Sequence, residues 1–442
     1  MENELPKGWK IQPLKDVVTS MKGKKPKILS ELPFDNSIPY IDIKALEKDL
    51  IEQYADIGSS KSFSPNDIAV VWDGARCGWV AKAKEGAIGS TICALTPLDI
   101  ESNYLYYFLL SKYSLVNSKS RGVGIPHIDP TLFWNMEVPI PLPKEQKKIA
   151  EKLDKLFGQI ESIKKSIERI PELLKNFRQQ ILTYAVTGKL TEDYCNSLCY
   201  MDLQEIILQL KEQRINQLSI KSAKDKLEKI YSDDNSSLDF PIPKQWIPVN
   251  IDKVCDSFTY GTSAKSENEG KYPVIRMGNI QNGKLDWSDL KYTSDESEYM
   301  KYKLNIGDIL FNRTNSPELV GKTTIYDGNR VACYAGYIIK IDPYRKYVNP
   351  YYLNIVLNSQ YAKRWCWENK TDGVSQSNIN AQKISKFTIP YPSLSEQEEI
   401  VNRVQSLFTK LDIVEKRYAA LCDILDKLPQ AILNKAFKGK LL

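Results

Sequence analysis

Residues 181–190 read ILTYAVTGKL, and residues 432–441 read ILNKAFKGKL, 251 positions further along a chain of 442 residues. A stretch that returns in this way indicates that one structural unit occurs twice in the chain. Each stretch ends a long segment in which apolar residues recur periodically. We therefore expect a fold built from two copies of a unit that closes with a helix.

The same spacing of 251 positions relates further pairs of segments upstream of these stretches. The pairs are residues 122–123 (GV) with 373–374 (GV), 138–141 (VPIP) with 389–392 (IPYP), and 145–146 (EQ) with 396–397 (EQ). Residues 5–9 (LPKGW) return as residues 242–246 (IPKQW), 237 positions later. Loop insertions would produce this change of spacing. Two copies, each with a globular half and a helical half, predict pseudo-two-fold symmetry within the chain.

The helical halves carry apolar residues at alternating spacings of four and three, over residues 149–184 and 400–432. This pattern is typical of a coiled-coil seam. Each helix should span about 40 residues, or roughly 60 Å. We expect the two helices to pair with each other, although pairing with helices of another subunit would also bury the seam. The seam residues are Leu153, Ile160, Ile167, Leu174, Val404, Leu411, Leu421 and Leu425.

Two prolines, Pro171 and Pro429, lie inside these segments. Each removes a backbone donor and crowds the preceding turn, so we expect a kink at both positions. The two prolines are not at equivalent places in the repeat.

The globular halves read as mixed α/β, with short β-rich runs broken by Gly, Pro and Asn, and with one helix each near residues 104–112 and 350–360. The stretch between the copies is helix-prone and charged, and it ends in a linker-like composition. The sequence thus predicts an α+β chain. Its segments are residues 1–144 (first globular domain), 145–190 (first long helix), 191–237 (linker), 238–394 (second globular domain) and 395–442 (second long helix).

Composition narrows the possible functions. The chain has 61 Lys and Arg against 55 Asp and Glu, so a polyanionic partner would have to meet a local basic face. No apolar run approaches the ~20 residues of a membrane span, and the first residues do not resemble a secretory signal, so we expect a cytoplasmic protein without a membrane partner. His127 is the one histidine, which argues against a Cys/His zinc site and against His-based catalysis. We expect no metal and no cofactor.

Three loop regions in each copy carry residues suited to binding nucleic acid. The first holds four lysines within six residues, a density that suits phosphate neutralisation but that also occurs on ordinary solvated surfaces. These residues are Lys22, Lys24, Lys25 and Lys27 in the first copy, and Thr262 and Lys265 in the second.

The second region follows an apolar strand, and the third follows a glycine. Arg and Asn pair bidentately with guanine and adenine edges, so such loops are candidate base readers. The alternative is a loop whose polar groups bond only to one another. The candidates are Arg76 and His127 in the first copy, and Asn312, Arg313, Asn315, Gln376 and Asn378 in the second.

Two motifs that suggest an enzyme are incomplete. Residues 321–323 (GKT) resemble the end of a phosphate-binding loop, but its first glycine is replaced by Ser316. Residues 349–352 (NPYY) resemble the Asn-Pro-Pro-Tyr tetrapeptide of amino-methyltransferases with one proline missing, and no glycine-rich cofactor loop accompanies them. We therefore expect no catalytic residue in this chain.

Taken together, the repeated motifs resemble those of the specificity subunit of type I restriction-modification enzymes. The motifs are residues 5–9 (LPKGW), 140–146 (IPLPKEQ) and 185–190 (AVTGKL) in the first copy, and 389–392 (IPYP), 396–397 (EQ) and 436–441 (AFKGKL) in the second. The resemblance covers nearly the whole chain, and the motifs occur in duplicate and in order.

The resemblance implies a non-catalytic DNA-binding subunit. Its two globular domains would be target-recognition domains, each reading one half of a bipartite, asymmetric site on double-stranded DNA. An antiparallel pair of long helices would set the unread spacer and dock two methyltransferase subunits, and motor-nuclease subunits would join that core. Methyl transfer, ATP use and cleavage would belong to the partners.

Two other classes of protein are alternatives. One is an enzyme that carries its own active site, against which the incomplete motifs argue. The other is a coiled-coil adaptor that binds only protein. A methylation assay on the isolated chain tests the first alternative, and DNA binding by the assembled complex tests the second.

Overall fold

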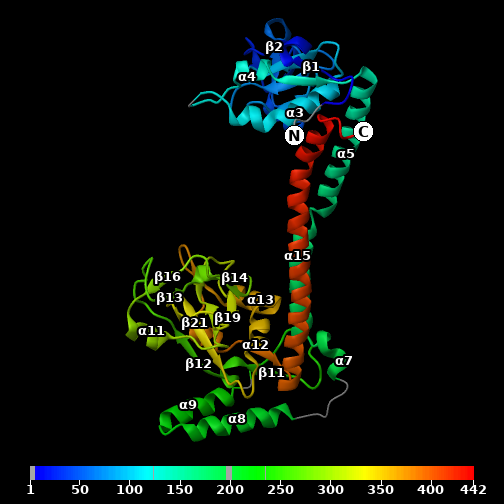
Figure 1. The fold of residues 1–442 in the computed structure, drawn as a ribbon. Helices are drawn as coiled ribbons and strands as arrows, with labels where there is room; N and C mark the ends of the chain where they lie inside the picture. The colour runs from blue at the N-terminus through cyan, green and yellow to red at the C-terminus, as the bar shows by residue number, and fades with distance from the viewer. Residues whose placement is uncertain (1–4, 123, 196–201, 234) are drawn as a thin grey trace. The chain divides into compact units, whose positions relative to one another are not determined.

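The computed structural model describes residues 5–122, 124–195, 202–233 and 235–442 (Figure 1). It divides into two compact units. Unit 1 comprises Met1–Glu168 with Tyr418–Leu442, and unit 2 comprises Arg169–Arg417. The long helix α15 (Leu394–Ala436) contributes its first part to unit 2 and its last part to unit 1. The expected α+β fold is confirmed, and no described helix has the length and apolar composition needed to cross a bilayer.

Unit 1 is built on a four-stranded antiparallel sheet of order β2-β9-β6-β7. The apolar run of β6 (Ile68–Val71) is buried along its whole length, so this strand lies in the core. A second sheet has the order β3-β5-β4-β8, and β1 pairs with β10. Helix α3 (Ser102–Ser118) covers the expected helix at residues 104–112, and the Glu101 carboxylate caps it by accepting the Tyr104 N–H at 2.6 Å.

The other elements of unit 1 are β1 (Lys10–Pro13), α1 (Leu14–Val17), β2 (Val18–Lys22), β3 (Leu29–Ser30), β4 (Ser37–Ile41), α2 (Ile43–Lys48), β5 (Tyr54–Asp56), β7 (Val80–Lys82), β8 (Ala87–Ile88), β9 (Ile92–Pro97), α4 (Pro130–Trp134), β10 (Glu137–Ile140) and α5 (Pro143–Ile167).

Unit 2 repeats this plan. Its main sheet has the order β12-β21-β17-β19, its first and last strands β11 and β24 pair as β1 and β10 do, and β17 (Ile309–Asn312) is buried along its whole length. The strand order confirms the internal repeat that the sequence predicted. Helices α12 (Pro350–Leu357) and α13 (Gln360–Asn369) cover the expected helix near residues 350–360.

The other elements of unit 2 are α6 (Ile170–Val186), α7 (Glu192–Cys195), α8 (Leu203–Gln217), α9 (Lys221–Tyr231), β11 (Ile247–Asn250), α10 (Ile251–Val254), β12 (Cys255–Tyr260), β13 (Tyr272–Ile275), β14 (Ile280–Gln281), β15 (Lys284–Leu285), β16 (Lys291–Thr293), α11 (Glu296–Tyr302), β18 (Thr314–Asn315), β19 (Thr323–Ile325), β20 (Cys333–Tyr334), β21 (Ile338–Pro343), β22 (Thr371–Asp372), β23 (Ser377–Asn378), α14 (Ala381–Ile384) and β24 (Thr388–Tyr391).

The two prolines of the long helices behave differently. The first long helix is interrupted between α5 and α6, and Pro171 lies in the first turn of α6, where its missing N–H costs nothing. Pro429 lies inside α15, which continues through it without interruption. One of the two points at which the chain passes between the units, between residues 168 and 169, coincides with the interruption between α5 and α6.

The long helices pack against each other in both units, as the seam predicted. In unit 1 Lys164 of α5 pairs with Asp426 of α15 at 2.7 Å, and in unit 2 Arg178 of α6 pairs with Asp412 of α15. Burial is uneven along the seam. Leu153, Ile160, Leu174, Val404 and Leu425 are buried, Ile167 and Leu411 are half-buried, and Leu421 is exposed.

In each unit, the repeated sequence motifs meet at one place, which we call the joint. In the joint of unit 1, the Trp9 indole N–H donates to the Glu145 carboxylate at 3.2 Å. In the joint of unit 2, the Trp246 indole N–H donates to the Glu396 carboxylate at 2.9 Å. Both contacts tie the segment before the first strand of the unit to the first turn of a long helix.

The glutamine of each Glu-Gln pair completes the joint. The Gln146 amide donates to the Pro141 carbonyl at 2.9 Å and accepts the Glu101 N–H at 2.9 Å, directly before α3. Gln397 makes the same two contacts, to the Pro392 carbonyl at 3.0 Å and from the Asn349 N–H at 2.8 Å. In each unit, one glutamine side chain thus fixes the start of the long helix to the residue that precedes the next helix, α3 in unit 1 and α12 in unit 2.

A glycine from the end of a long helix closes each joint. Gly188 and Gly439 have φ of +74° and +67°, which suits glycine. A Cβ on Gly188 would lie 2.3 Å from Pro243, and a Cβ on Gly439 would lie 2.0 Å from Pro6. The turn after each helix therefore packs directly on the proline of the motif that opens the unit.

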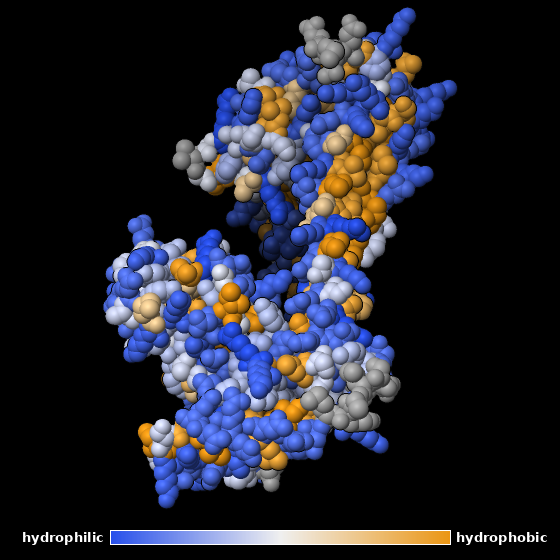
Figure 2. Space-filling model, turned by 60° about the horizontal axis from the view of Figure 1, so that its bottom comes forward, coloured by the Kyte–Doolittle hydropathy of each residue, from blue (hydrophilic) through white to orange (hydrophobic). Residues whose placement is uncertain are grey.

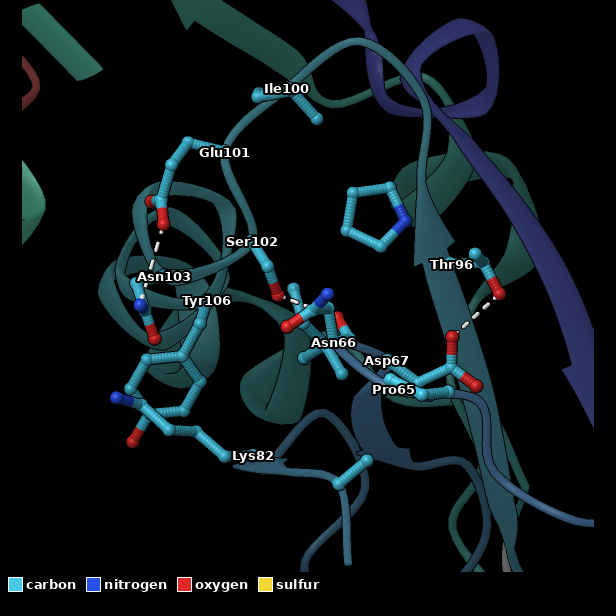
Figure 3. Close-up of a pocket in the computed structure, with 13 residues that line it drawn as sticks. Pro65, Asn66, Asp67, Lys82, Thr96, Ile100, Glu101, Ser102, Asn103 and Tyr106 are labelled. Atoms are coloured by element: carbon cyan, nitrogen blue, oxygen red, sulfur yellow. Dashed lines mark hydrogen bonds between the residues drawn. The ribbon is translucent and has the colours of Figure 1, made fainter. Parts of the chain in front are cut away.

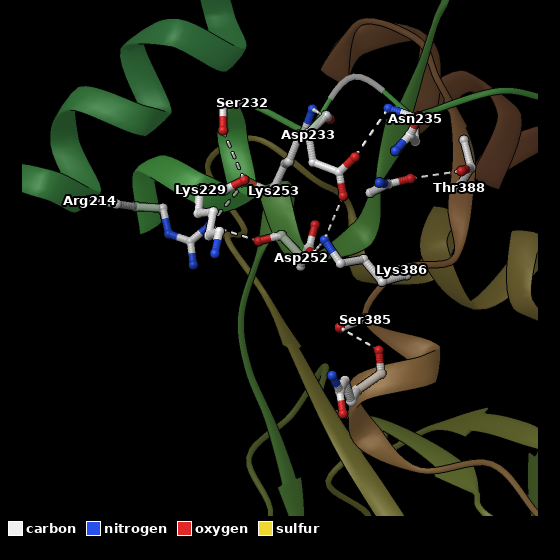
Figure 4. Close-up of polar contacts among 12 residues, drawn as sticks. Arg214, Lys229, Ser232, Asp233, Asn235, Asp252, Lys253, Ser385, Lys386 and Thr388 are labelled. Carbon is white, nitrogen blue, oxygen red and sulfur yellow. Dashed lines mark hydrogen bonds and ion pairs between the residues drawn. The ribbon is translucent and has the colours of Figure 1, made fainter. Parts of the chain in front are cut away.

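The segment between the two copies forms a helical hairpin of α8 and α9 in unit 2 (Figure 1), and Figure 4 shows polar contacts of this segment. Arg214 of α8 is buried and donates to the carbonyls of Asp252 and Lys253, at 2.8 and 3.2 Å. Lys386 bridges Asp233, after the hairpin, to Asp252, at 2.9 and 3.2 Å. The predicted helical, charged linker is thus anchored to the globular part of unit 2.

Candidate nucleic-acid interface

In unit 2, several candidate residues meet around Arg313, directly after β17. The Arg313 guanidinium lies over the ring of Tyr260 at 4.7 Å. It donates to the Gly336 carbonyl at 3.4 Å and to the Asn378 side-chain oxygen at 3.3 Å. Its Nε is buried and has no hydrogen-bond partner among the described residues. A planar cation is thus held in place by long contacts, with donor capacity remaining.

The loops that carry these residues are joined by a small three-stranded sheet of order β18-β23-β22. The Asn378 amide donates to the Thr314 hydroxyl at 2.8 Å, which ties β23 to β18. Asn315 lies opposite Ser377 in this sheet, and its side-chain oxygen accepts the Ser316 N–H at 2.9 Å. Gln376 is exposed on the loop between β22 and β23. The structure thus brings together Arg313, Asn315, Gln376 and Asn378.

Unit 1 has the same frame with different side chains. Trp72 follows β6 as Arg313 follows β17. The Trp72 carbonyl accepts the Ile128 N–H at 3.0 Å, and the Arg313 carbonyl accepts the N–H of the equivalent residue, Ile379, at 2.9 Å. The Trp72 ring packs on Phe133 at a centroid distance of 5.5 Å, so it is part of an apolar cluster. An aromatic ring in unit 1 therefore takes the place of a cation in unit 2.

Polar residues surround Trp72 in unit 1. His127 pairs with Asp73 and with Arg121 through single β-bridges. Lys22, the last residue of β2, forms an ion pair with Asp73 at 2.8 Å, and Arg121 forms one with Asp129 at 2.7 Å. Burial alone would raise the pKa of Asp129, but hydrogen bonds from Arg121 and from backbone N–H groups hold it below the usual range.

The remaining lysine candidates are free to meet a partner. Lys24, Lys25, Lys27 and Lys265 are exposed. Among the residues that the structure describes, their ammonium groups form no ion pair. Exposed, unpaired lysines of this kind suit contact with a phosphate backbone.

Two candidates need correction. Asn312 is fully buried at the end of β17, so it cannot touch a duplex from this position. Thr262 is also buried, and its hydroxyl bonds the Glu298 carboxylate. A third candidate, Arg76, stays exposed, and its guanidinium forms an ion pair with Glu47 at 2.6 Å, a hydrogen bond that raises the pKa of Arg76.

Sequence reasoning missed Tyr260 and Arg121. Tyr260 is the last residue of β12, equivalent to Lys22 at the end of β2, and each precedes a glycine that packs on a backbone carbonyl. The available signals were weak: an aromatic residue before Gly261 and an arginine before Gly122.

Unit 1 also contains a polar pocket between β6, β9 and the start of α3 (Figure 3). Its carboxylates have structural partners. Asp67 accepts the Ser64 N–H and the Thr96 hydroxyl, each at 2.7 Å, and Glu101 caps α3. Among the described residues, no group of three or more His, Cys, Asp or Glu side chains could hold a metal ion. The two carboxylates of the pocket thus take part in hydrogen bonds that stabilise the fold of unit 1.

Comparison with known proteins gives a consistent result. The sequence matches the family described as "Type I restriction modification DNA specificity domain" over residues 6–172 and 243–422. It is 28% identical to the type I restriction enzyme EcoKI specificity subunit of Escherichia coli (strain K12), over 99% of this chain and 90% of the relative. It is 27% identical to the StySPI specificity subunit of Salmonella potsdam, over the same shares of the two chains.

Solved structures show the same fold. The HsdS subunit from Thermoanaerobacter tengcongensis matches with a TM-score of 0.62 at 16% identity, over 99% of this chain and 98% of that chain. A chain from a structure concerning complex assembly of the type I R-M system also matches with a TM-score of 0.62, at 18% identity, over 99% of this chain and 100% of that one.

Proposed function

The chain belongs to the type I restriction-modification DNA specificity family, and on this premise we propose that unit 1 and unit 2 each read one half of a bipartite, asymmetric site on double-stranded DNA. Within that family it is the non-catalytic specificity subunit, which recognises the DNA target for a type I complex. Methyl transfer, ATP use and cleavage are then tasks of the partner subunits.

One observation carries the proposal of two different half-sites. The joints of the two units use the same residue types and the same contacts. At the candidate nucleic-acid interface, in contrast, equivalent positions carry different side chains in the two units. Trp72 is equivalent to Arg313, and Lys22 is equivalent to Tyr260. A shared frame with exchanged side chains supports two readers of different sequence, because base edges are distinguished by the side chains that meet them.

The proposed contacts follow from position in the fold and from side-chain chemistry. In unit 2, Arg313 and Asn378 are the proposed base readers, with Asn315 and Gln376 beside them and Lys265 on the phosphates. In unit 1, His127 lies at the corresponding place, where single β-bridges join it to Asp73 and Arg121, and Lys22 lies at the end of β2. Lys24, Lys25 and Lys27 are the proposed phosphate contacts of this unit. Exposed lysines supply affinity without sequence preference, whereas Arg and Asn supply discrimination.

The long helices supply the proposed docking surface for two methyltransferase subunits, which motor-nuclease subunits then join. Figure 2 shows apolar residues gathered over the long helices of unit 1. Exposed apolar side chains recur along these helices, which is typical of surfaces that associate with other proteins. They are Ile163, Leu421 and Ile424 in unit 1, and Leu173, Phe177, Ile413 and Val414 in unit 2. We further propose that the helices set the length of the unread spacer.

The test uses the chain assembled with its methyltransferase. Mapping of modified adenines first supplies the target sequence. Arg313→Ala should then weaken binding by about 1–3 kcal/mol and relax preference only in the half-site read by unit 2. Arg121→Ala is the matched variant in unit 1, and it should affect only the other half-site. Binding is measured on duplexes in which one half-site at a time is changed.

Equal losses at both half-sites from either variant would contradict independent readers. Absence of a bipartite motif with a fixed gap, in a complex that assembles, would contradict the whole assignment and favour a protein-binding adaptor.

A further inference from the structure

The loop between β22 and β23 stands out from the surface of unit 2. All six residues from 371 to 376 are exposed, while Ser377 and Ile379 behind them are fully buried. The Gly373 N–H donates to the Gln376 carbonyl at 2.8 Å, which closes the loop. The base of the hairpin is anchored by Asp372, whose carboxylate accepts from the Lys370 ammonium at 2.6 Å. The tip is thus a short, closed projection on a fixed base.

Val374 lies at the tip of this hairpin and is fully exposed, with a relative accessibility of 109%. No described residue covers it. A single exposed valine is ordinary on a protein surface. What distinguishes Val374 from other exposed valines is its place next to the proposed base readers. It lies four residues before Asn378, which accepts a hydrogen bond from the Arg313 guanidinium, on a strand of the sheet that joins the proposed base readers.

The internal repeat provides the second observation. The dipeptide Gly373-Val374 occurs at the equivalent place in the first copy, as residues 122–123, whereas the next two residues are Ser-Gln in one copy and Gly-Ile in the other. If the two units read different half-sites, a side chain that both copies share cannot provide the difference. The shared valine therefore fits a task that does not depend on base identity.

We infer that Val374 is an apolar wedge, which presses between two adjacent base pairs of the half-site read by unit 2 and opens their stacking. This inference rests on the proposed function and adds a deformation of the DNA to it. Proteins that insert aliphatic side chains between base steps offset the cost of unstacking with the additional contacts that the deformed duplex allows. The loop carries no charged group at residues 373–376 that would have to be desolvated on entry.

The experiment uses the assembled complex and target duplexes that carry 2-aminopurine at successive positions of this half-site. The wild-type complex should raise the fluorescence at one base step apart from the modified adenine. Val374→Ser should abolish that rise and weaken binding roughly five- to tenfold, without changing which half-site sequence is preferred. Val331→Ser is the matched control, because Val331 is also exposed in unit 2 but lies outside the sheet β18-β23-β22. This variant should behave as the wild type.

The outcomes separate the wedge from the proposed function. A wild-type complex without sequence-specific binding would contradict the proposed function itself. Specific binding by the wild type, with the same fluorescence in Val374→Ser, would overturn the wedge alone. If replacing one thymine by uracil reproduces the whole loss, Val374 contacts a thymine methyl group and is no wedge. If Val374→Ser binds DNA normally but loses a partner subunit, the tip belongs to a protein interface.

Discussion

Trp9 and Trp246 occupy the same place in the two joints, but their surroundings differ. Trp246 and its acceptor Glu396 are both buried, whereas Trp9 and Glu145 are only half-buried. A hydrogen bond to a carboxylate is worth more where water cannot replace it. The same contact should therefore contribute unequally to the stability of the two units.

Replacing each tryptophan by phenylalanine tests this difference. Trp246→Phe removes a donor from a buried carboxylate and should lower the free energy of unfolding by about 1–3 kcal/mol, with Trp9→Phe having the smaller effect. Urea denaturation of both variants provides the measurement. Equal losses would show that exposure does not decide the strength of this contact.

At the residue scale, the sequence could identify the interface loops but not the direction of each side chain. Asn312 and Arg313 are neighbours of similar promise, yet one points into the core and the other reaches Tyr260. Alternation along a strand does not say which of two polar residues at its end lies inside. The burial of Thr262 depends on Glu298, and the place of Arg313 depends on Asn378, and both partners are distant in sequence.

At the scale of elements, the long helices end where glycine permits it. Gly188→Ala and Gly439→Ala place a Cβ against a proline in a left-handed conformation, so each should destabilise its unit by at least ~1 kcal/mol. Gly158→Ala is the control, because Gly158 lies within α5 with nothing near its Cβ, and it should stabilise by about 0.5–1 kcal/mol. Thermal unfolding of the three variants gives the comparison. A stabilised Gly188→Ala would contradict the close packing of the joint.

The exposed apolar side chains of the helices give a second prediction at this scale. Phe177→Asp on α6 and Ile424→Asp on α15 should each weaken association with the methyltransferase at least tenfold, because a charge would be buried at the interface. Both residues are 57% exposed, so folding should not change. Met300→Asp, at a residue 62% exposed on α11, is the control. Association is measured by analytical ultracentrifugation, and unchanged binding in both helix variants would place the docking surface elsewhere.

The sequence predicted the helices well because a long seam of spacing three and four is typical of paired helices and of few other structures. It could not predict where the seam is covered. Leu425 and Leu421 are one turn apart in the same pattern, but Leu425 packs into the core of unit 1 and Leu421 is exposed. Which turns of a helix are covered depends on the domains that pack beside it, and periodicity carries no information about them.

At the scale of the whole molecule, the internal repeat was the strongest indication of the fold in the sequence, and the equal strand orders of the two main sheets confirm it.

If the helices set the length of the spacer, inserting one heptad at facing positions of α6 and α15 should lengthen the spacer. Seven residues add about 10 Å, or roughly three base pairs. Sequencing of the modified sites gives the new gap directly. An unchanged gap would show that the helices do not measure the distance.

The joint of unit 1 is made by Pro6 and Gly439, and that of unit 2 by Pro243 and Gly188. A glycine and a proline thus close each joint. In unit 1 these two residues are far apart in the sequence, whereas in unit 2 they lie on either side of the linker. The order of connection is therefore secondary to the complementarity of the surfaces. If two relatives carry the same joint residues, the portion between one joint and the next should fit either frame as a cassette. A recombination event would then create a new pair of half-sites in one step, without any new side chain having to evolve.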